Sequence, residues 1–174
     1  MTGYRRELSL DSALAKVSFC KDGVQYEREY FVSHPANVMA VRFAASQRGK
    51  QNLVFSYAPN PVSTGEMKAD GTDALCWLAH LDKNNMEYAV RIKAVAKGGQ
   101  VSNEGGKLTV KDADEVVFLI TADTDYKPNY NPNFDDAKAY VGVNPESTTR
   151  QWVDQAVAKG YESLFKEHYN DYAS

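Results

Sequence analysis

Two carboxylates near the end of an apolar run form the pair in this chain that is best placed for acid–base chemistry. Asp123 and Asp125 follow the run from Glu115 to Ala122 and are separated by one residue. In a strand, side chains two residues apart share a face and lie about 6–7 Å apart. Two carboxyl groups at about that separation can protonate a glycosidic oxygen and activate a water. The alternative is an aspartate-rich strand exit whose carboxylates accept backbone N–H groups, and we favour that structural role.

The sequence gives little support for metal or cofactor chemistry. Its histidines are His34, His80 and His168, and their spacing is not that of a zinc site. We expect His34 to lie in a turn, because Pro35 follows it, and His168 to face a further domain. The chain contains no glycine-rich phosphate-binding motif. We therefore expect neither a metal nor a cofactor.

The cysteines and tryptophans are interpreted as structural residues. Cys20 and Cys76 could pair, but two buried free thiols are the favoured reading of so few cysteines. Trp77 and Trp152 are expected in the core rather than as platforms for a ligand.

A loop rich in tyrosine, asparagine and proline follows the carboxylate pair, from Tyr126 to Phe134. Exposed aromatic rings can stack on the faces of sugar rings, and asparagine amides can bridge sugar hydroxyls. Aromatic side chains are also typical anchors of protein interfaces, and we favour packing against another domain over direct glycan contact. The candidate contact residues are Asp125, Tyr126, Tyr130 and Phe134.

Strands must position these residues. Apolar and polar side chains alternate from Tyr4 to Phe43, which is the pattern of strands with one buried and one wet face. Asp22-Gly23 lies between two of the runs and predicts a type I′ hairpin, because both positions tolerate positive φ. The stretch therefore predicts four consecutive antiparallel strands.

Further strands are predicted downstream. Leu53–Tyr57 and Met86–Val95 have strand patterns, and the second places Arg91 on a polar face. The continuous apolar run Glu115–Ala122 predicts a central strand covered on both faces. Short strands are expected at 100–103 and 108–110. Residues 60–85 are read as a long connection that contains one strand or a half-turn.

The C-terminal part is predicted to be helical. Asn144-Pro145 resembles a helix start, Gly160 interrupts the helical pattern, and a second apolar stripe follows. The stripe consists of Tyr161, Leu164, Phe165 and His168. The predicted fold is therefore mainly β, an antiparallel and supersandwich-like β-sandwich over residues 1–144, with a short helical segment over residues 145–174.

Composition narrows the function classes. The chain has 174 residues, 25% charged residues and a net charge of −3, which is typical of one soluble domain. It has no basic cluster of the kind that neutralises nucleic-acid phosphates. No apolar run approaches the about 20 residues of a membrane span, and the first residues lack a signal segment. We therefore expect neither nucleic-acid nor membrane binding.

Several blocks of sequence resemble a known family in the same order along the chain. The blocks are YRRELSLD (4–11), AKVSF (15–19), DGVQYEREYFVS (22–33), MEYAVRIKAVAKGGQV (86–101), LTVKDADEVVFLITADTDY (108–126) and the ending YESL…H…DY (161–172). Together they resemble the N-terminal β-sandwich domain of glycoside hydrolase family 95, whose members are α-L-fucosidases and some α-L-galactosidases. One departure is Asp123, where the family pattern suggests a small residue.

The resemblance carries several expectations about a longer parent protein. In the family, sandwich strands precede the block at Tyr4, and an (α/α)6 barrel with the catalytic residues follows the region of Tyr172. The chain is therefore expected to be a partial domain with no catalytic residue of its own. The parent would invert the configuration on hydrolysing terminal α-L-fucosyl or α-L-galactosyl linkages, and would be periplasmic or secreted.

Three functions of different classes are consistent with these observations. The first is a non-catalytic sandwich that supports the catalytic barrel of the same polypeptide. The second is an autonomous carbohydrate-binding module, and the third is a structural sandwich without a ligand. Apolar surface that a parent buries would be exposed in the isolated chain. We therefore expect the chain to self-associate, or its C-terminal helices to dock onto the sandwich.

Overall fold

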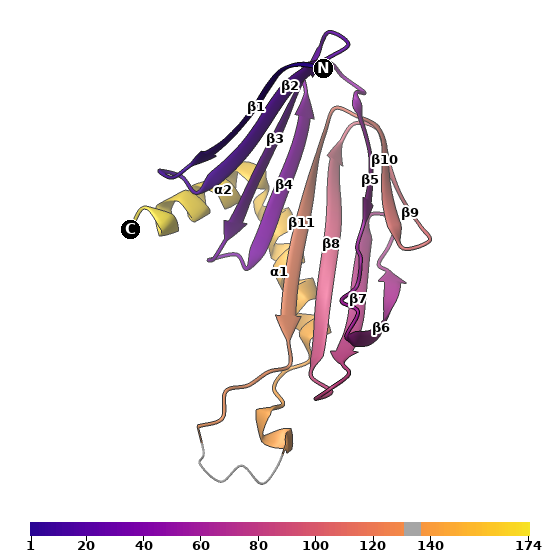
Figure 1. The fold of residues 1–174 in the computed structure, drawn as a ribbon, viewed down its shortest axis with the longest axis vertical. Helices are drawn as coiled ribbons and strands as arrows, with labels where there is room; N and C mark the ends of the chain where they lie inside the picture. Colours follow the sequence, from indigo (N-terminus) through magenta and orange to yellow (C-terminus); the bar gives the residue numbers. More distant parts are fainter. Residues whose placement is uncertain (131–136) are drawn as a thin grey trace.

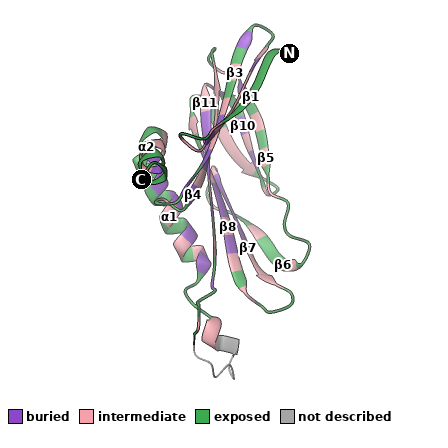
Figure 2. Ribbon diagram, turned by 60° about the vertical axis from the view of Figure 1, so that its left-hand side comes forward, coloured by how far each residue is buried: buried purple, intermediate pink, exposed green. Residues whose placement is uncertain are grey.

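The computed structural model describes residues 1–130 and 137–174, which form three layers (Figure 1). The middle layer is an eight-stranded antiparallel sheet with the strand order β1-β2-β3-β4-β11-β8-β7-β6. A three-stranded antiparallel sheet, β5-β10-β9, packs on one face, and helices α1 and α2 pack on the other (Figure 2). The predicted antiparallel β-rich fold with a short C-terminal helical segment is confirmed.

The strands and helices have the following bounds. The large sheet consists of β1 Thr2–Ser9, β2 Leu14–Lys21, β3 Val24–Ser33, β4 Val38–Ala45, β6 Ser63–Ala69, β7 Ala74–Leu81, β8 Glu87–Lys97 and β11 Glu115–Thr124. The small sheet consists of β5 Gln51–Ser56, β9 Gln100–Glu104 and β10 Lys107–Ala113. A 3-10 helix, η1 Ala137–Tyr140, precedes α1 Pro145–Lys159 and α2 Tyr161–Tyr172.

The first four strands form a meander, as the alternation predicts. Each pairs with the next in antiparallel register. Asp22 and Gly23 join β2 to β3 with φ values of 52° and 74°. Both central residues thus have the positive φ that a type I′ turn requires, and the predicted hairpin is confirmed.

The region read as one long connection contains two strands, so that interpretation is wrong. β6 pairs with β7 over its whole length, from Ser63 opposite Leu81 to Ala69 opposite Leu75. β6 is an exposed edge strand with little apolar alternation. The first half of β7 is buried on both faces, so its sequence is a continuous apolar run instead. Neither strand therefore shows the period-2 signal.

Strand β11 divides the hydrophobic core into two clusters. Phe118 faces the small sheet, where its ring lies 5.0 Å from the ring of Phe55, centroid to centroid. Leu119, the next residue, belongs to the cluster beneath the helices. The sheet–sheet cluster contains Val41, Leu75, Ile92, Ala94, Leu108, Val110, Ala113, Val116 and Phe118. The sheet–helix cluster contains Leu14, Phe31, Val38, Ala40, Val117, Leu119, Val153, Ala156 and Leu164. The prediction of a central strand covered on both faces is confirmed.

Arg91 lies on the polar face of β8, but the structure covers that face at Arg91. Helix α1 covers that face, and the Arg91 side chain has no exposed surface. The Arg91 guanidinium pairs with the carboxylate of Asp70, which also binds Arg150 of α1 at 3.0 Å. A second Arg91 nitrogen lies 3.4 Å from the carbonyl oxygen of Glu146. Arg91, on the predicted polar face of β8, thus connects the sheet to α1 through Asp70 and the Glu146 carbonyl.

The helix boundaries agree with the sequence. Asn144 caps α1, because its side-chain oxygen accepts the N–H of Glu146 at 2.8 Å. Val153 and Ala156 are buried against the sheet. Gly160 separates α1 from α2 with a φ of 75°, which breaks the helical path.

Helix α2 packs on the strands of its own chain, so the expected outward orientation of His168 is wrong. Leu164 is fully buried, and His168 is 5% exposed. The His168 ring stacks on Phe31 of β3 at 5.0 Å, and its Nε2 lies 3.0 Å from the carbonyl oxygen of Ser12. Docking of the C-terminal helices is the second of the two expected ways to cover apolar surface. Self-association stays a prediction.

A buried carboxylate fixes the start of α2. Glu29 is 7% exposed and accepts bonds from Lys16 at 2.6 Å, Arg42 at 3.0 Å and the Tyr161 hydroxyl at 2.9 Å. Burial alone would raise the pKa of Glu29, but these three donors outweigh it and lower the pKa. Burial and the adjacent Glu29 together raise the pKa of Tyr161, so its hydroxyl stays protonated and donates.

The structure also settles the predictions for the cysteines and tryptophans. Cys20 and Cys76 are both free, as favoured, but only Cys76 is buried, whereas Cys20 is half-buried. Trp77 is buried and its Nε1 donates to the Tyr88 hydroxyl at 3.0 Å, whereas Trp152 is half-buried. Among the described residues, no helix is both long and apolar enough to cross a bilayer.

Replacing Asp70 by Asn should destabilise the fold by about 3 kcal/mol, because Arg91 would remain buried without its counter-charge. The matched control is Asp73→Asn in the same turn. Asp73 pairs with Lys93, also on β8, but both side chains are partly exposed, so the expected loss is at most about 1 kcal/mol. Urea unfolding of both variants measures the loss in the free energy of unfolding. Equal losses would contradict a stabilising role for the buried Arg91–Asp70 pair.

The pH dependence of unfolding should contain a contribution from Glu29. Its folded-state pKa is lowered, so its stabilising effect is complete above the unfolded value of about 4.3 and is lost as pH falls through the folded-state pKa. Glu29→Gln should therefore lower stability at neutral pH and flatten the decline below about pH 5. The control is Glu27→Gln, since Glu27 lies 3.8 Å from Lys16 and is largely exposed. If the stability of wild type and of Glu29→Gln declined identically as the pH falls below about 5, the stabilising role of Glu29 would be refuted.

Candidate interdomain and glycan contact site

The candidate site begins where β11 ends, at Asp125. The Asp125 side chain is almost buried, and its Oδ1 accepts the backbone N–H of Glu87 at 3.0 Å. The Asp125 N–H donates in return to the Glu87 carbonyl oxygen at 3.0 Å. This reciprocal pair extends the contact between β8 and β11 beyond Thr124. The Asp125 carboxylate therefore has the structural role favoured for the aspartate pair, while Asp123 is half-buried on the same strand.

The two ends of the loop after Asp125 are joined to each other. Tyr126 forms an isolated antiparallel bridge with Val141, and its ring stacks on Tyr140 at 5.9 Å with an interplanar angle of 11°. The Gly142 N–H donates to the Asp125 carbonyl oxygen at 2.5 Å. A Cβ at residue 142 would lie 3.0 Å from that oxygen and 3.2 Å from the Cβ of Lys127. Glycine thus permits the close approach of the two ends.

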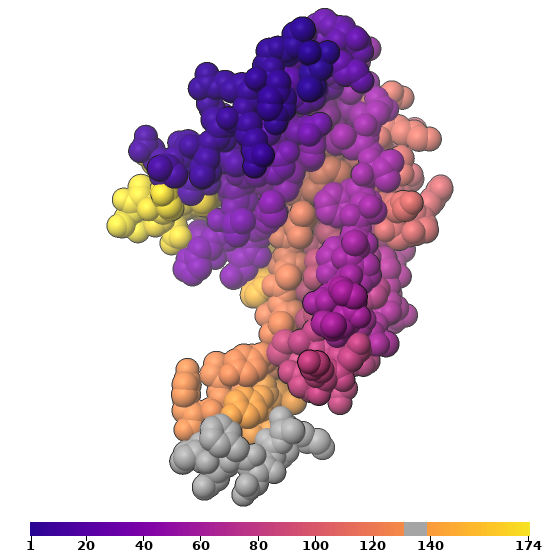
Figure 3. Space-filling view, viewed as in Figure 1, coloured from indigo at the N-terminus to yellow at the C-terminus, as the bar shows by residue number. Residues whose placement is uncertain are grey.

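The loop presents aromatic and aliphatic side chains to solvent. Figure 3 shows its described parts projecting from the end of the sandwich. Tyr130 is 92% exposed and Tyr126 is 54% exposed, and Val141 and Val143 are also exposed. Phe134, the fourth predicted contact residue, lies outside the described residues. Whether these side chains contact another domain or a glycan stays a prediction.

A groove of about 470 Å³ lies beside the base of the loop. Strands β6, β7 and β8 form its floor, and the start of α1 forms one wall. Its polar lining comes from Thr64, Glu66, His80, Glu87, Asn144 and Glu146. Carboxylate, amide, imidazole and hydroxyl groups such as these can bind sugar hydroxyls. No group of metal-ligating side chains is found among the described residues.

Sequence reasoning did not identify the groove. Its residues come from three strands and a helix start, and two of those strands lie in the region read as a connection. The only local signal is the Asn144-Pro145 helix start, which places a capped N-terminus at one wall. The adjacency of Glu66, His80 and Glu87 follows from strand register, which the sequence does not display.

Comparisons with known proteins agree with this architecture. The family model described as "Glycosyl hydrolase family 65, N-terminal domain" matches residues 1–129. The chain is 29% identical over 180 residues to a "Probable alpha-fucosidase A" of Aspergillus niger, and 26% identical over 191 residues to "Alpha-L-fucosidase 2" of Arabidopsis thaliana. These alignments cover 98% and 97% of the chain, but 22% of each relative.

A solved structure shares the fold at much lower identity. A "Putative kojibiose phosphorylase from human microbiome" superposes with a TM-score of 0.60 and 8% identity. The superposition covers 98% of this chain and 24% of that protein. The chain therefore spans about a quarter or less of the proteins that it resembles.

Asp125→Ala should destabilise the chain by about 1–2 kcal/mol, because the buried N–H of Glu87 would lose its acceptor. Asp123→Ala, two residues earlier on the same strand, is the control, with an expected change within about 0.5 kcal/mol. Chemical denaturation followed by tryptophan fluorescence measures both. A neutral Asp125→Ala would show that the carboxylate does not hold the base of the loop.

Proposed function

Because the chain belongs to the family of glycosyl hydrolase family 65 N-terminal domains, we propose that it is the non-catalytic sandwich of an α-L-fucosidase-type glycoside hydrolase. The observation that carries this proposal is the alignment of nearly the whole chain with about a fifth of two α-fucosidases. Those relatives have ample further length for a catalytic domain. The parent would hydrolyse terminal α-L-fucosyl or α-L-galactosyl linkages, with inversion, and would be periplasmic or secreted.

The structural role of Asp125 supports a non-catalytic assignment. A catalytic pair would need both carboxylates available to substrate, one as an acid and one as a base. Asp125 is instead almost buried and bound to the backbone of Glu87. The pair that offered acid–base chemistry in the sequence thus has one member committed to holding β11 against β8.

The loop at the end of the sandwich is the proposed contact with the catalytic barrel of the same polypeptide. Its two ends are fixed by the Asp125–Gly142 bond and by the stacked rings of Tyr126 and Tyr140. Tyr130 projects beyond this base. Tyrosine contributes large contact area and loses little conformational entropy, and aromatic residues are enriched at interfaces. The described base of the loop is therefore a preorganised aromatic contact.

The second candidate function is carbohydrate binding by the sandwich itself. The observation that favours it is the polar groove next to the exposed tyrosines, since Glu87 belongs both to the groove lining and to the base of the loop. A sugar in the groove could bond to carboxylates while its ring lies against an aromatic face. A glycan array with the 174-residue chain separates the two functions, because a supporting domain alone should bind none.

The isolated chain should not hydrolyse aryl α-L-fucosides or α-L-galactosides, whereas the longer natural polypeptide that contains it should hydrolyse at least one. Release of the aryl group by both proteins measures this. Turnover by the isolated chain that disappears in Asp123→Asn or Asp125→Asn would overturn the non-catalytic assignment. An inactive long polypeptide with intact folding would contradict the fucosidase-type parent.

A further inference from the structure

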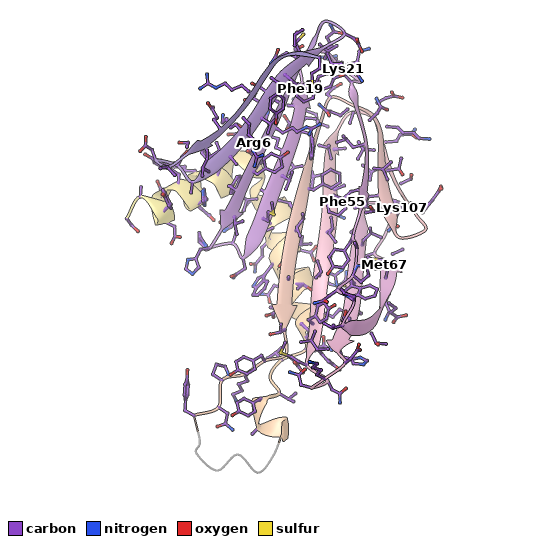
Figure 4. All side chains as sticks on the ribbon, in the orientation of Figure 1. Arg6, Phe19, Lys21, Phe55, Met67 and Lys107 are labelled. Atoms are coloured by element: carbon purple, nitrogen blue, oxygen red, sulfur yellow. The ribbon has the colours of Figure 1, made fainter. Side chains whose placement is uncertain are left out.

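The small sheet covers only part of the large sheet and leaves a trough at its edge. β5 is the edge strand of the small sheet and lies against β4. Beyond it, the face formed by β1, β2 and β3 is open towards the viewer in Figure 4, where Arg6, Phe19 and Lys21 are labelled. A trough of about 330 Å³ lies between strands β2, β3 and β4 and the start of β5. We call it the Arg28 trough, and its main lining residues are Phe19, Lys21, Tyr26, Arg28, Lys50 and Gln51.

Aromatic rings hold Arg28 in place within the trough. Its guanidinium carbon lies 5.2 Å from the ring centroid of Phe19 and 5.4 Å from that of Phe43. The Phe19 ring is itself stacked on Tyr26 at 5.1 Å. Cation–π contacts of this kind orient a guanidinium without using its N–H donors. The arginine is therefore preorganised, and its hydrogen-bonding capacity remains available.

Arg28 differs from the other partly or fully buried arginines in lacking an acceptor. Arg91 pairs with Asp70, and Arg42 pairs with both Glu29 and Glu115. Within residues 1–130 and 137–174, Arg28 makes no ion pair or hydrogen bond with a protein group. A half-buried guanidinium has five N–H donors in a fork that fits a carboxylate or a sulfate.

The charges around Arg28 favour an anion. Lys21 and Lys50 also line the trough. Arg6 lies in the same cross-strand row as Arg28, because both are paired with Val17 from opposite sides. The one carboxylate among the described lining residues, Glu27, lies 3.8 Å from Lys16. The trough is thus locally cationic although the whole chain has a net charge of −3.

We propose that the Arg28 trough binds the carboxylate or sulfate group of an acidic sugar. Arg28 binds two oxygens of the anion side by side, and Lys21 and Lys50 add charge at the rim. The volume is at the small end of ligand sites and suits one monosaccharide ring. Gln51 also lines the trough and is 3% exposed. This site is separate from the loop and groove at the other end of the sheet, and does not depend on the function of either.

Calorimetric titration of the 174-residue chain at low ionic strength tests the proposal. The probes are D-galacturonate, D-galactose 6-sulfate, methyl β-D-galactoside and inorganic sulfate. Both acidic sugars should bind, the neutral sugar should not, and inorganic sulfate should bind about tenfold more weakly than the sugar sulfate because it lacks the ring contacts. Binding should weaken with added salt, because the rim charges are screened.

Variants assign the binding to Arg28. Arg28→Gln should weaken binding of both acidic sugars by about tenfold or more, and Arg28→Lys should also weaken it because lysine lacks the planar fork. Lys107→Gln, which removes an exposed charge from β10 away from the trough (Figure 4), is the matched control and should bind as wild type. Thermal melts check that each variant is folded. If Arg28→Gln is unfolded, the double variant Lys21→Gln/Lys50→Gln at exposed positions replaces it, with the same expected loss.

Three results would overturn the proposal. The first is binding of the neutral sugar as tightly as the acidic sugars. The second is inorganic sulfate binding as tightly as the sugar sulfate, which would reduce the trough to a site for free ions. The third is unchanged binding in folded Arg28 or lysine variants.

Discussion

Strand β11 runs through the middle of the molecule, and each of its faces holds a different layer. Phe118 packs against the small sheet, and Leu119 packs beneath the helices. Alternation within one strand therefore joins three layers, since successive side chains point to opposite faces. The pairing of β11 with β4 and β8 also joins the N-terminal meander to the remaining strands. Both hydrophobic clusters therefore contain side chains of this strand.

Ion pairs and hydrogen bonds between the helices and the sheet add directional contacts to the apolar packing. Arg91 binds Asp70, which also binds Arg150 of α1, and Glu29 binds Tyr161 at the start of α2. Hydrophobic burial has no preferred direction, whereas these bonds require particular atoms to meet. They therefore fix where each helix lies along the sheet. Displacing either helix would break its bonds to these groups, although Arg91 would still pair with Asp70, and Glu29 with Lys16 and Arg42.

The unequal size of the two sheets accounts for where ligands or partners could bind. The end of β11 projects past the small sheet, and the loop with its stacked tyrosines continues from there. At the other side, β5 ends the small sheet, and Arg28 lies half-buried beside its edge, against the ring of Phe19. The relatives are about four to five times longer than the aligned region, since it covers 22% of each.

The sequence alone determined the elements whose signals are local. Alternation identified the four-strand meander, Asp22-Gly23 identified its hairpin, and the uninterrupted run at Glu115–Ala122 identified the central strand. Asn144 and Gly160 marked the helix ends. The order of the sequence blocks also indicated a glycoside hydrolase sandwich, which the family match confirms. Each of these features depends on residues that are near one another in the chain.

Tertiary structure decided the features that depend on which layer covers which face. Residues 60–85 were read as a connection with one strand or a half-turn, because β6 has little apolar alternation and the first half of β7 is a continuous apolar run. Arg91 was assigned to a polar face and His168 to a contact with a further domain, but α1 covers Arg91 and α2 places His168 on Phe31. The polar groove and the Arg28 trough each draw residues from separate strands. Period and composition show which side chains share a face, but only the packing of a second layer determines whether that face meets protein or water.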